Sequence, residues 1–299
     1  MKKVITRIIS FISFALVAIE AFNKISLYFV NKKTRVTPIV DKTYTWRFGD
    51  IKYMEKGKGT PLLLLHSMTP GSSSLEWKSV VNTLAEKYHV YTLDLPGFGV
   101  SDKKIKTFTN YIFVSAVCDF ISDIIKEKTT IVTSGESACI GLISGYQRKN
   151  LFDKIIFVNP DSMRTFNISP DKNSKMIKKL YSLPIVGTLL YLIDMRKDDN
   201  DDYLFSGQYD GENARYYYAS YFGFYVNFPV HHIIDKVEVP LLIITGNDYN
   251  ALHKMTLEYG DYLDSWYDIE ECFQFPHLEK PEAFCDALDT LFQYDYNDK

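Results

Sequence analysis

Short apolar runs that end abruptly in polar residues constrain the fold of this chain more than any other feature of its sequence. The clearest are PLLLLHS (61–67), FDKIIFVNPD (152–161) and VEVPLLIITGND (237–248). A continuous apolar run of this length is typical of a strand buried on both faces of a parallel sheet. Segments with helical periodicity, such as 77–88 and 109–128, separate the runs. The alternation predicts an α/β fold with a mostly parallel, doubly wound sheet.

Two segments near the ends of this region extend the pattern. WRFGDIKYMEKGKG (46–59) has two short strand patterns around a Gly-Asp pair, which predicts a hairpin. PEAFCDALDTLFQY (281–294) has the periodicity of a terminal helix. In a parallel sheet the polar ends of the strands meet at one edge, where ligands bind. The residues at these ends are His66, Ser67, Asp94, Ser137, Asp161 and Asp248.

Residues 162–236 interrupt the alternation and predict a mainly helical insertion. Placed over the carboxyl ends of the strands, this insertion would form a lid. Its aromatic stretch YYYASYFGFYVNF (216–228) would either pack the lid onto the core or line an apolar ligand site. The chain is accordingly divided into a hydrophobic helix with a basic flank (1–40), the two parts of the core (41–161 and 237–299) and the lid (162–236).

The first thirty residues are strongly apolar, with IISFISFALVAIEAF (8–22) followed by NKISLYFV (23–30). The unbroken apolar part is shorter than the roughly 20 residues of a membrane span, and no convincing small-x-small cleavage site follows it. Three interpretations stand: an uncleaved signal-anchor, a helix in the membrane interface, or a helix packed on the protein's own body. We expect membrane association through residues 4–30. The basic residues at both ends leave the side of the membrane open.

Composition excludes several classes of protein. The 34 Lys and Arg residues against 37 Asp and Glu give a net charge of −3, so no general attraction to nucleic acid is expected. The four cysteines form no CxxC pair and no cluster with histidine at metal spacing, and they are expected to be free thiols. No metal site and no cofactor are predicted.

The segment GESAC (135–139) follows a predicted strand and begins a helix, and it carries the main chemical signal of the chain. A serine on such a sharp turn has its hydroxyl exposed at the end of the sheet. The backbone N–H of Ala138, the next residue, would point to the place where an oxyanion forms. The helix N-terminus adds positive potential there. Ser137 is therefore the candidate nucleophile.

The sequence resembles the α/β-hydrolase superfamily of esterases, lipases and haloperoxidases over about residues 46–299. The motifs that carry the resemblance are LLLLHS, VYTLDLPGFGVSDK, GESAC, VPLLIITGND and PHLEKPEAF. This resemblance implies the roles of nucleophile for Ser137 and of triad acid for Asp248, with Asp161 as the alternative acid. It implies a second oxyanion N–H from Ser67 or Met68, beside that of Ala138.

The resemblance does not supply a catalytic histidine. Counting back from the Glu-x-Pro at 279–281 places Gln274 where the family usually has its base. His277, three residues later, is the candidate base if the loop is reshaped, and His253 is a more distant one. The family's histidine at the position of His66 usually orders the oxyanion loop.

Two functions from different classes are therefore expected. The first is a serine hydrolase that acts on a carboxylic ester or a related small apolar acyl substrate. In that case Ser137 attacks, His277 takes the proton and Asp248 orients the base. The second is a catalytically impaired member of the fold that binds an apolar ligand or a partner at the membrane. A lyase or other cofactor-free reaction is a third alternative.

Overall fold

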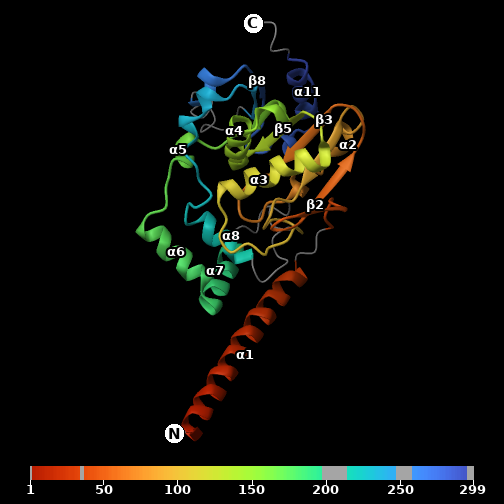
Figure 1. Cartoon of the computed structure of the whole chain (residues 1–299). Helices are drawn as coiled ribbons and strands as arrows, with labels where there is room; N and C mark the ends of the chain where they lie inside the picture. Colours follow the sequence, from red (N-terminus) through yellow and green to blue (C-terminus); the bar gives the residue numbers. More distant parts are fainter. Residues whose placement is uncertain (1, 34–36, 197–213, 247–257, 295–299) are drawn as a thin grey trace.

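The computed structural model describes residues 2–33, 37–196, 214–246 and 258–294. Its centre is an eight-stranded sheet in the order β1-β2-β4-β3-β5-β6-β7-β8 (Figure 1). Strands β1 and β2 form an antiparallel hairpin, β2 also pairs antiparallel with β4, and the other neighbours are parallel. The strands are β1 Lys42–Trp46, β2 Gly49–Lys56, β3 Pro61–Leu65, β4 His89–Leu93, β5 Thr129–Ser134, β6 Phe152–Val158, β7 Leu241–Gly246 and β8 Ser265–Ile269. The predicted α/β class and the hairpin are confirmed.

The central strands consist of apolar residues because both faces of the sheet are covered. Along β3, Leu63 and Leu65 belong to one core cluster, whereas Leu62 and Leu64 belong to another on the opposite face. This separation follows from the two-residue period of a strand. The first cluster includes side chains of α3 (Asn110–Phe120) and α4 (Ala138–Gln147), and the second includes those of α2 (Val81–Leu84) and α11 (Pro281–Phe292). Each face thus has its own layer of helices.

Two local predictions differ from the structure. The helix expected over residues 77–88 is reduced to a 3₁₀ turn at Ser74–Trp77 and the single turn of α2. Strand β8 was not predicted, because its sequence SWYDI is exposed over most of its length at the sheet edge. An edge strand lacks the continuous apolar run by which the inner strands are found.

The segment between β6 and β7 contains four described α-helices, two described 3₁₀ turns (Val230–His232 and Ile234–Lys236) and no described strand. The α-helices are α5 Met163–Phe166, α6 Lys172–Ser182, α7 Pro184–Arg196 and α8 Ala214–Tyr221. Tyr217 of α8 is completely buried and contacts the rings of Phe98 and Phe108 in the core. Tyr217 therefore packs the lid onto the body. This packing is one of the two roles expected for the aromatic stretch 216–228.

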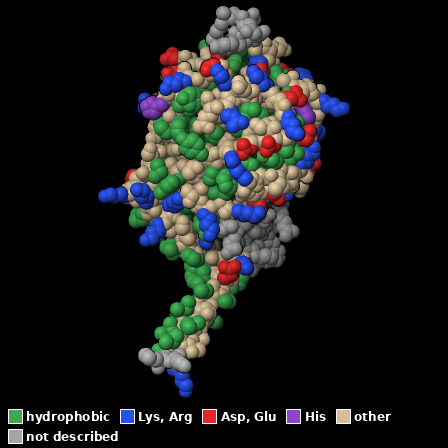
Figure 2. Space-filling view, in the orientation of Figure 1, with side chains coloured by type: hydrophobic (Ala, Val, Ile, Leu, Met, Phe, Trp, Pro, Cys, Tyr) green, Lys and Arg blue, Asp and Glu red, His purple; other side chains and the backbone are tan. Residues whose placement is uncertain are grey.

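Helix α1 (Lys2–Lys33) projects from the body (Figure 1). Residues Lys3–Ser26 are long and apolar enough to cross a membrane, and none of their most apolar window is buried. Phe11 and Phe14 are each 73% exposed, and the projecting helix carries many apolar side chains on its surface (Figure 2). The alternative of a helix packed along the protein's own body is therefore wrong for this segment. Its contact with the body is made near Asn23, against α7.

Candidate functional site

The turn after β5 is the place where this fold normally carries its nucleophile. Strand β5 ends at Ser134, and the next residue, Gly135, has a φ of +54°. Ser137 has φ −67° and ψ −9°, which is ordinary helical backbone. In a nucleophile elbow the reactive residue occupies the strained position between strand and helix. That position is held by Gly135, which has no side chain to react.

Ser137, the predicted nucleophile, lies two residues after this strained position. The Ser137 side chain is completely buried. Its hydroxyl donates to the carbonyl of Ser134 at 2.8 Å and lies 3.3 Å from the carbonyl of Leu65. A hydroxyl that holds the carbonyl ends of two adjacent strands cannot reach a substrate. Ser137 is therefore a small structural residue of the turn.

The N–H groups predicted to stabilise an oxyanion already have partners. The N–H of Ala138 is bonded to the carbonyls of Gly135 and Glu136. The N–H of Ser67 donates to Oε2 of Glu76 at 2.8 Å. The N–H groups of Ala138 and Ser67 are thus both engaged within the protein, and their roles in an oxyanion hole stay predictions.

Met68 remains in the site. Its carbonyl accepts a hydrogen bond from the Tyr217 hydroxyl, and the residue lines the cavity described below. Its proposed role as an N–H donor stays a prediction.

Glu136, which follows the elbow glycine, is the centre of a hydroxyl network. Its Oε2 accepts from the Ser67 hydroxyl at 2.6 Å, and its Oε1 accepts from Thr69 at 2.9 Å and from Tyr221 at 3.0 Å. Three donors compensate a carboxylate for the water that it loses on partial burial. The network joins β3, the elbow turn and α8.

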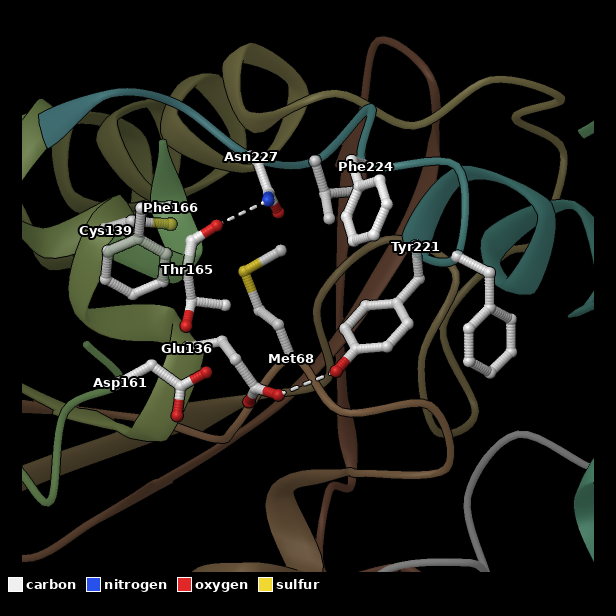
Figure 3. A pocket seen from close by; sticks show the side chains of 11 residues that line it. Met68, Glu136, Cys139, Asp161, Thr165, Phe166, Tyr221, Phe224 and Asn227 are labelled. Carbon is white, nitrogen blue, oxygen red and sulfur yellow. Dashed lines mark hydrogen bonds between the residues drawn. The ribbon is translucent and has the colours of Figure 1, made fainter. Parts of the chain in front are cut away.

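A cavity of about 110 Å³ opens above this network, between the sheet and the lid (Figure 3). Its wall is mainly apolar, and the polar side chains on it include two carboxylates. The described residues that line it are Met68, Glu136, Cys139, Asp161, Thr165, Phe166, Tyr221, Phe222, Phe224, Val226 and Asn227. No histidine is among them. An apolar cavity with a few convergent polar groups is the usual form of a small-molecule site.

Asp161 is the second carboxylate of the cavity, and it lies beside Glu136 in Figure 3. Burial, and after it the negative charge of Glu136, raises the pKa of Asp161 to about 7. The residue follows β6, as expected for the alternative triad acid. With this pKa it can hold or release a proton near neutral pH.

His277 lies on the other side of the sheet end and does not line the cavity. Its ring is completely buried, stacks on Trp77 at 4.3 Å between ring centroids, and places Nε2 3.1 Å from Oε1 of Glu76. Burial favours the neutral form of Glu76, but the bonds from His277 and the Ser67 N–H outweigh it and lower its pKa. The structure thus brings His277 together with Glu76 and Trp77, and its role as a base for Ser137 stays a prediction.

The segment that normally carries the catalytic histidine is fixed to β6. Asn159 donates from Nδ2 to the carbonyls of Phe273 at 2.8 Å and Gln274 at 2.7 Å, and its Oδ1 accepts from the N–H of Gly246. The Gln274 side chain is exposed. Asp248 and His253, the predicted acid and the distant candidate base, lie outside the described residues.

Two polar residues at strand ends have structural partners. His66 Nε2 accepts from the N–H of Leu95 at 3.1 Å, and its Nδ1 lies 2.6 Å from the carbonyl of Ser67. Burial lowers the pKa of His66, so the neutral ring orders the loop, as the resemblance implied. Asp94 accepts from the N–H groups of Ser74 and Val100.

The cysteines do not form a reactive centre. All four are buried free thiols. Cys139 lines the cavity, but burial raises its pKa and thereby keeps it protonated. Within the described part of the chain no group of three metal-ligating side chains gathers.

Glu136 and Tyr221 are not among the site residues predicted from the sequence, and the positive φ of the turn lies at Gly135, two residues before Ser137. The sequence contained a signal for this turn. A glycine directly after the strand segment IVTS is the residue best suited to a positive φ. The Gly-x-Ser pattern instead indicates Ser137, two residues after this glycine.

A family model for the α/β hydrolase fold matches residues 60–281. The chain belongs to the α/β-hydrolase family. One relative is 2-hydroxy-6-oxo-6-(2'-aminophenyl)hexa-2,4-dienoic acid hydrolase of Metapseudomonas resinovorans, which is 25% identical over 86% of this chain and 94% of its own length. A soluble epoxide hydrolase of a Corynebacterium strain is 26% identical over 36% of this chain and 37% of its own length.

Solved structures repeat the fold at low sequence identity. A serine hydrolase involved in carbazole degradation superposes with a TM-score of 0.64 at 23% identity, covering 85% of this chain and 98% of its own. A membrane phospholipase A superposes with a TM-score of 0.59 at 18% identity, covering 98% of this chain and 100% of its own. At these identities the structures establish the fold alone.

Proposed function

We propose that this protein is a membrane-tethered member of the α/β-hydrolase family that binds a small, largely apolar molecule without a serine nucleophile at the elbow. The observation that carries the proposal is the glycine at the strained position of the turn. The buried hydroxyl of Ser137 and the pairing of His277 with Glu76 support it. An unactivated serine in this environment is a poor nucleophile.

The size and charge of the cavity define the ligand class. An apolar protein cavity of about 150 Å³ binds benzene, so the cavity of about 110 Å³ suits a ligand group of about one ring. Glu136 and Asp161 would repel an anionic head group and accept hydrogen bonds from a cationic or hydroxylated one. A compact molecule with an amine or hydroxyl group therefore fits better than a carboxylate.

The tether is proposed from α1. Its described apolar segment Lys3–Ser26 has 24 residues, which at about 1.5 Å per residue exceeds the roughly 30 Å of a bilayer core. Leaving its side chains in water would be costly, because apolar area costs about 25 cal/mol per Å². Flotation of the full chain with phospholipid vesicles tests this part. Full-length protein that stays at the bottom of the gradient would contradict it.

The absence of a serine nucleophile is tested with a fluorophosphonate probe. Wild-type protein and the Ser137→Ala variant should both remain unlabelled, while a serine hydrolase in the same reaction is labelled. Labelling of the wild type that disappears in Ser137→Ala would overturn the proposal.

The ligand class is tested with three probes of matched size: benzylamine, benzyl alcohol and benzoate. Binding should raise the melting temperature with the amine and the alcohol, and least with benzoate. Replacement of Glu136 by Gln should reduce the preference for the amine over benzoate. A stronger effect of benzoate on the wild type would contradict this assignment.

Hydrolysis by another route is the second candidate, and the position and pKa of Asp161 favour it. An ionised Asp161 would take a proton from water as the water oxygen attacks an acyl carbon, and Asp161 would return that proton to the leaving group as its bond to the acyl carbon breaks. Turnover of 4-nitrophenyl acetate that falls at least tenfold in Asp161→Asn, but not in Ser137→Ala, would support this route.

A further inference from the structure

We propose that helices α6 and α7 form a docking surface for an anionic phospholipid bilayer. This inference rests on the proposed tether and goes beyond it, because it concerns a second contact made by the lid. Figure 1 shows α7 beside α1, at the end of the body from which α1 projects.

Helix α7 presents one face to the body and the opposite face to solvent. Thr188 and Tyr191 are buried, and the Thr188 hydroxyl donates to Oδ1 of Asn23 on α1 at 2.8 Å. On the outer face Leu189 is 46% exposed and Ile193 is 53% exposed. Ile185, four residues before Leu189, continues the same stripe and is also exposed. Contiguous exposed apolar side chains of this kind mark interaction sites.

Helix α6 adds a basic edge to this apolar face. Its exposed lysines Lys172, Lys175 and Lys179 are spaced at steps of three and four, so they lie on one side of the helix. Met176, which is 57% exposed, and Leu180 lie next to them. A helix with lysines beside apolar residues is typical of one that lies in a membrane interface. Because the lysines are attracted to anionic head groups, this charge pattern favours an anionic bilayer.

The contact between α7 and α1 determines how deep this docking surface would lie relative to the bilayer. Asn23 is three residues before the end of the candidate span at Ser26, which corresponds to roughly 5 Å along a helix. If α1 crosses a membrane, α7 is held at the level of the head groups. Helices α6 and α7 meet at 102°, so both can lie in the plane of the interface.

The test places an environment-sensitive NBD fluorophore on a cysteine introduced by Leu189→Cys in the full chain. Tyr146→Cys on α4, which is 45% exposed in the wild type, is the matched control, and Ile193→Cys is a second reporter. The four native cysteines are buried, and labelled wild type measures their background. In vesicles that contain phosphatidylglycerol we expect a several-fold rise in NBD emission at positions 189 and 193, with quenching by spin-labelled lipid. The NBD emission at position 146 should not change.

The lipid charge is tested in the same preparation. The triple variant Lys172→Gln, Lys175→Gln, Lys179→Gln should bring the signal at position 189 down to its level in pure phosphatidylcholine, because each lysine contributes about fivefold to attraction by an anionic surface. Flotation without a signal at positions 189 and 193 would overturn the docking surface and leave the tether intact. Failure of flotation together with an absent NBD signal would overturn both the docking surface and the tether.

Discussion

Nε2 of His277 lies 3.1 Å from Oε1 of Glu76, and both side chains are buried to within 1% of their surface. Glu76 also receives the N–H of Ser67 through its other oxygen. The pair connects the C-terminal segment before α11 to the loop after β3. Removal of one partner from a buried pair of this kind destabilises the fold strongly, because the other polar group is left buried and uncompensated.

Replacement of His277 by Ala should therefore lower the free energy of unfolding by about 3–5 kcal/mol. Urea denaturation followed by circular dichroism measures this change. His231→Ala is the matched control, because His231 is exposed, and it should change stability by less than about 0.5 kcal/mol. Unchanged stability of His277→Ala, with loss of an activity, would instead return His277 to a catalytic role.

Asp161→Asn should make stability less sensitive to pH. Because folding raises the pKa of Asp161 to about 7, its proton-linked stabilisation is present below the ordinary pKa and is lost as the pH rises through about 7. The variant should thus be more stable than the wild type at pH 8, by on the order of 1–3 kcal/mol. Thermal melts at pH values from about 4 to 9 measure how the difference in stability between the two proteins changes with pH. Parallel melting curves for both proteins would contradict the assigned pKa.

Gly135→Ser restores a hydroxyl to the elbow and should still give no serine hydrolase. A Cβ at this position would lie 3.4 Å from the Ser67 hydroxyl, which is ordinary contact, so the variant should fold. The positive φ should cost about 1–2 kcal/mol. Gly99→Ser is the contrasting variant, since its Cβ would fall 1.9 Å from Oδ2 of Asp94 and should prevent folding. Fluorophosphonate labelling of Gly135→Ser would reveal a base outside the described residues.

Asn159→Ala should release the segment around Gln274. The substitution removes two hydrogen bonds to carbonyls and one from an N–H, and each is worth about 1 kcal/mol. We expect a loss of about 2–4 kcal/mol, with faster hydrogen exchange at Gly246. Asn227→Ala, which also removes bonds to two carbonyls but at an exposed site, should have a smaller effect. Equal losses of stability in the two variants would contradict the view that Asn159 holds the segment around Gln274 in place.

The fold was predictable because it depends on long apolar patterns. The runs that became β3, β6 and β7 are buried along most of their length, and only such strands read as continuous apolar segments. The edge strand β8 was missed for the converse reason. Periodicity thus located the inner sheet and left its exposed margin undetermined.

The site was harder to predict because a shift of two residues in register decides its chemistry. GESAC contains a serine and small neighbours, but the sign of φ at Gly135 can be read only from the path of the backbone. The contacts of Glu136 with Ser67 and Tyr221 join residues far apart in the chain, and no local pattern indicates them. Gln274 in place of the family's histidine was a local sign that the usual machinery is altered.

The projecting helix α1 has a consequence for how this protein would meet its ligand. If α1 anchors the body in a bilayer, as proposed, the protein searches a surface rather than a volume, and the local concentration of anything dissolved in that bilayer is correspondingly high. A weak intrinsic affinity would then be sufficient for occupancy of the cavity. The same protein without α1 would need a much higher total amount of a lipid-soluble ligand, whereas its response to a water-soluble one would be unchanged.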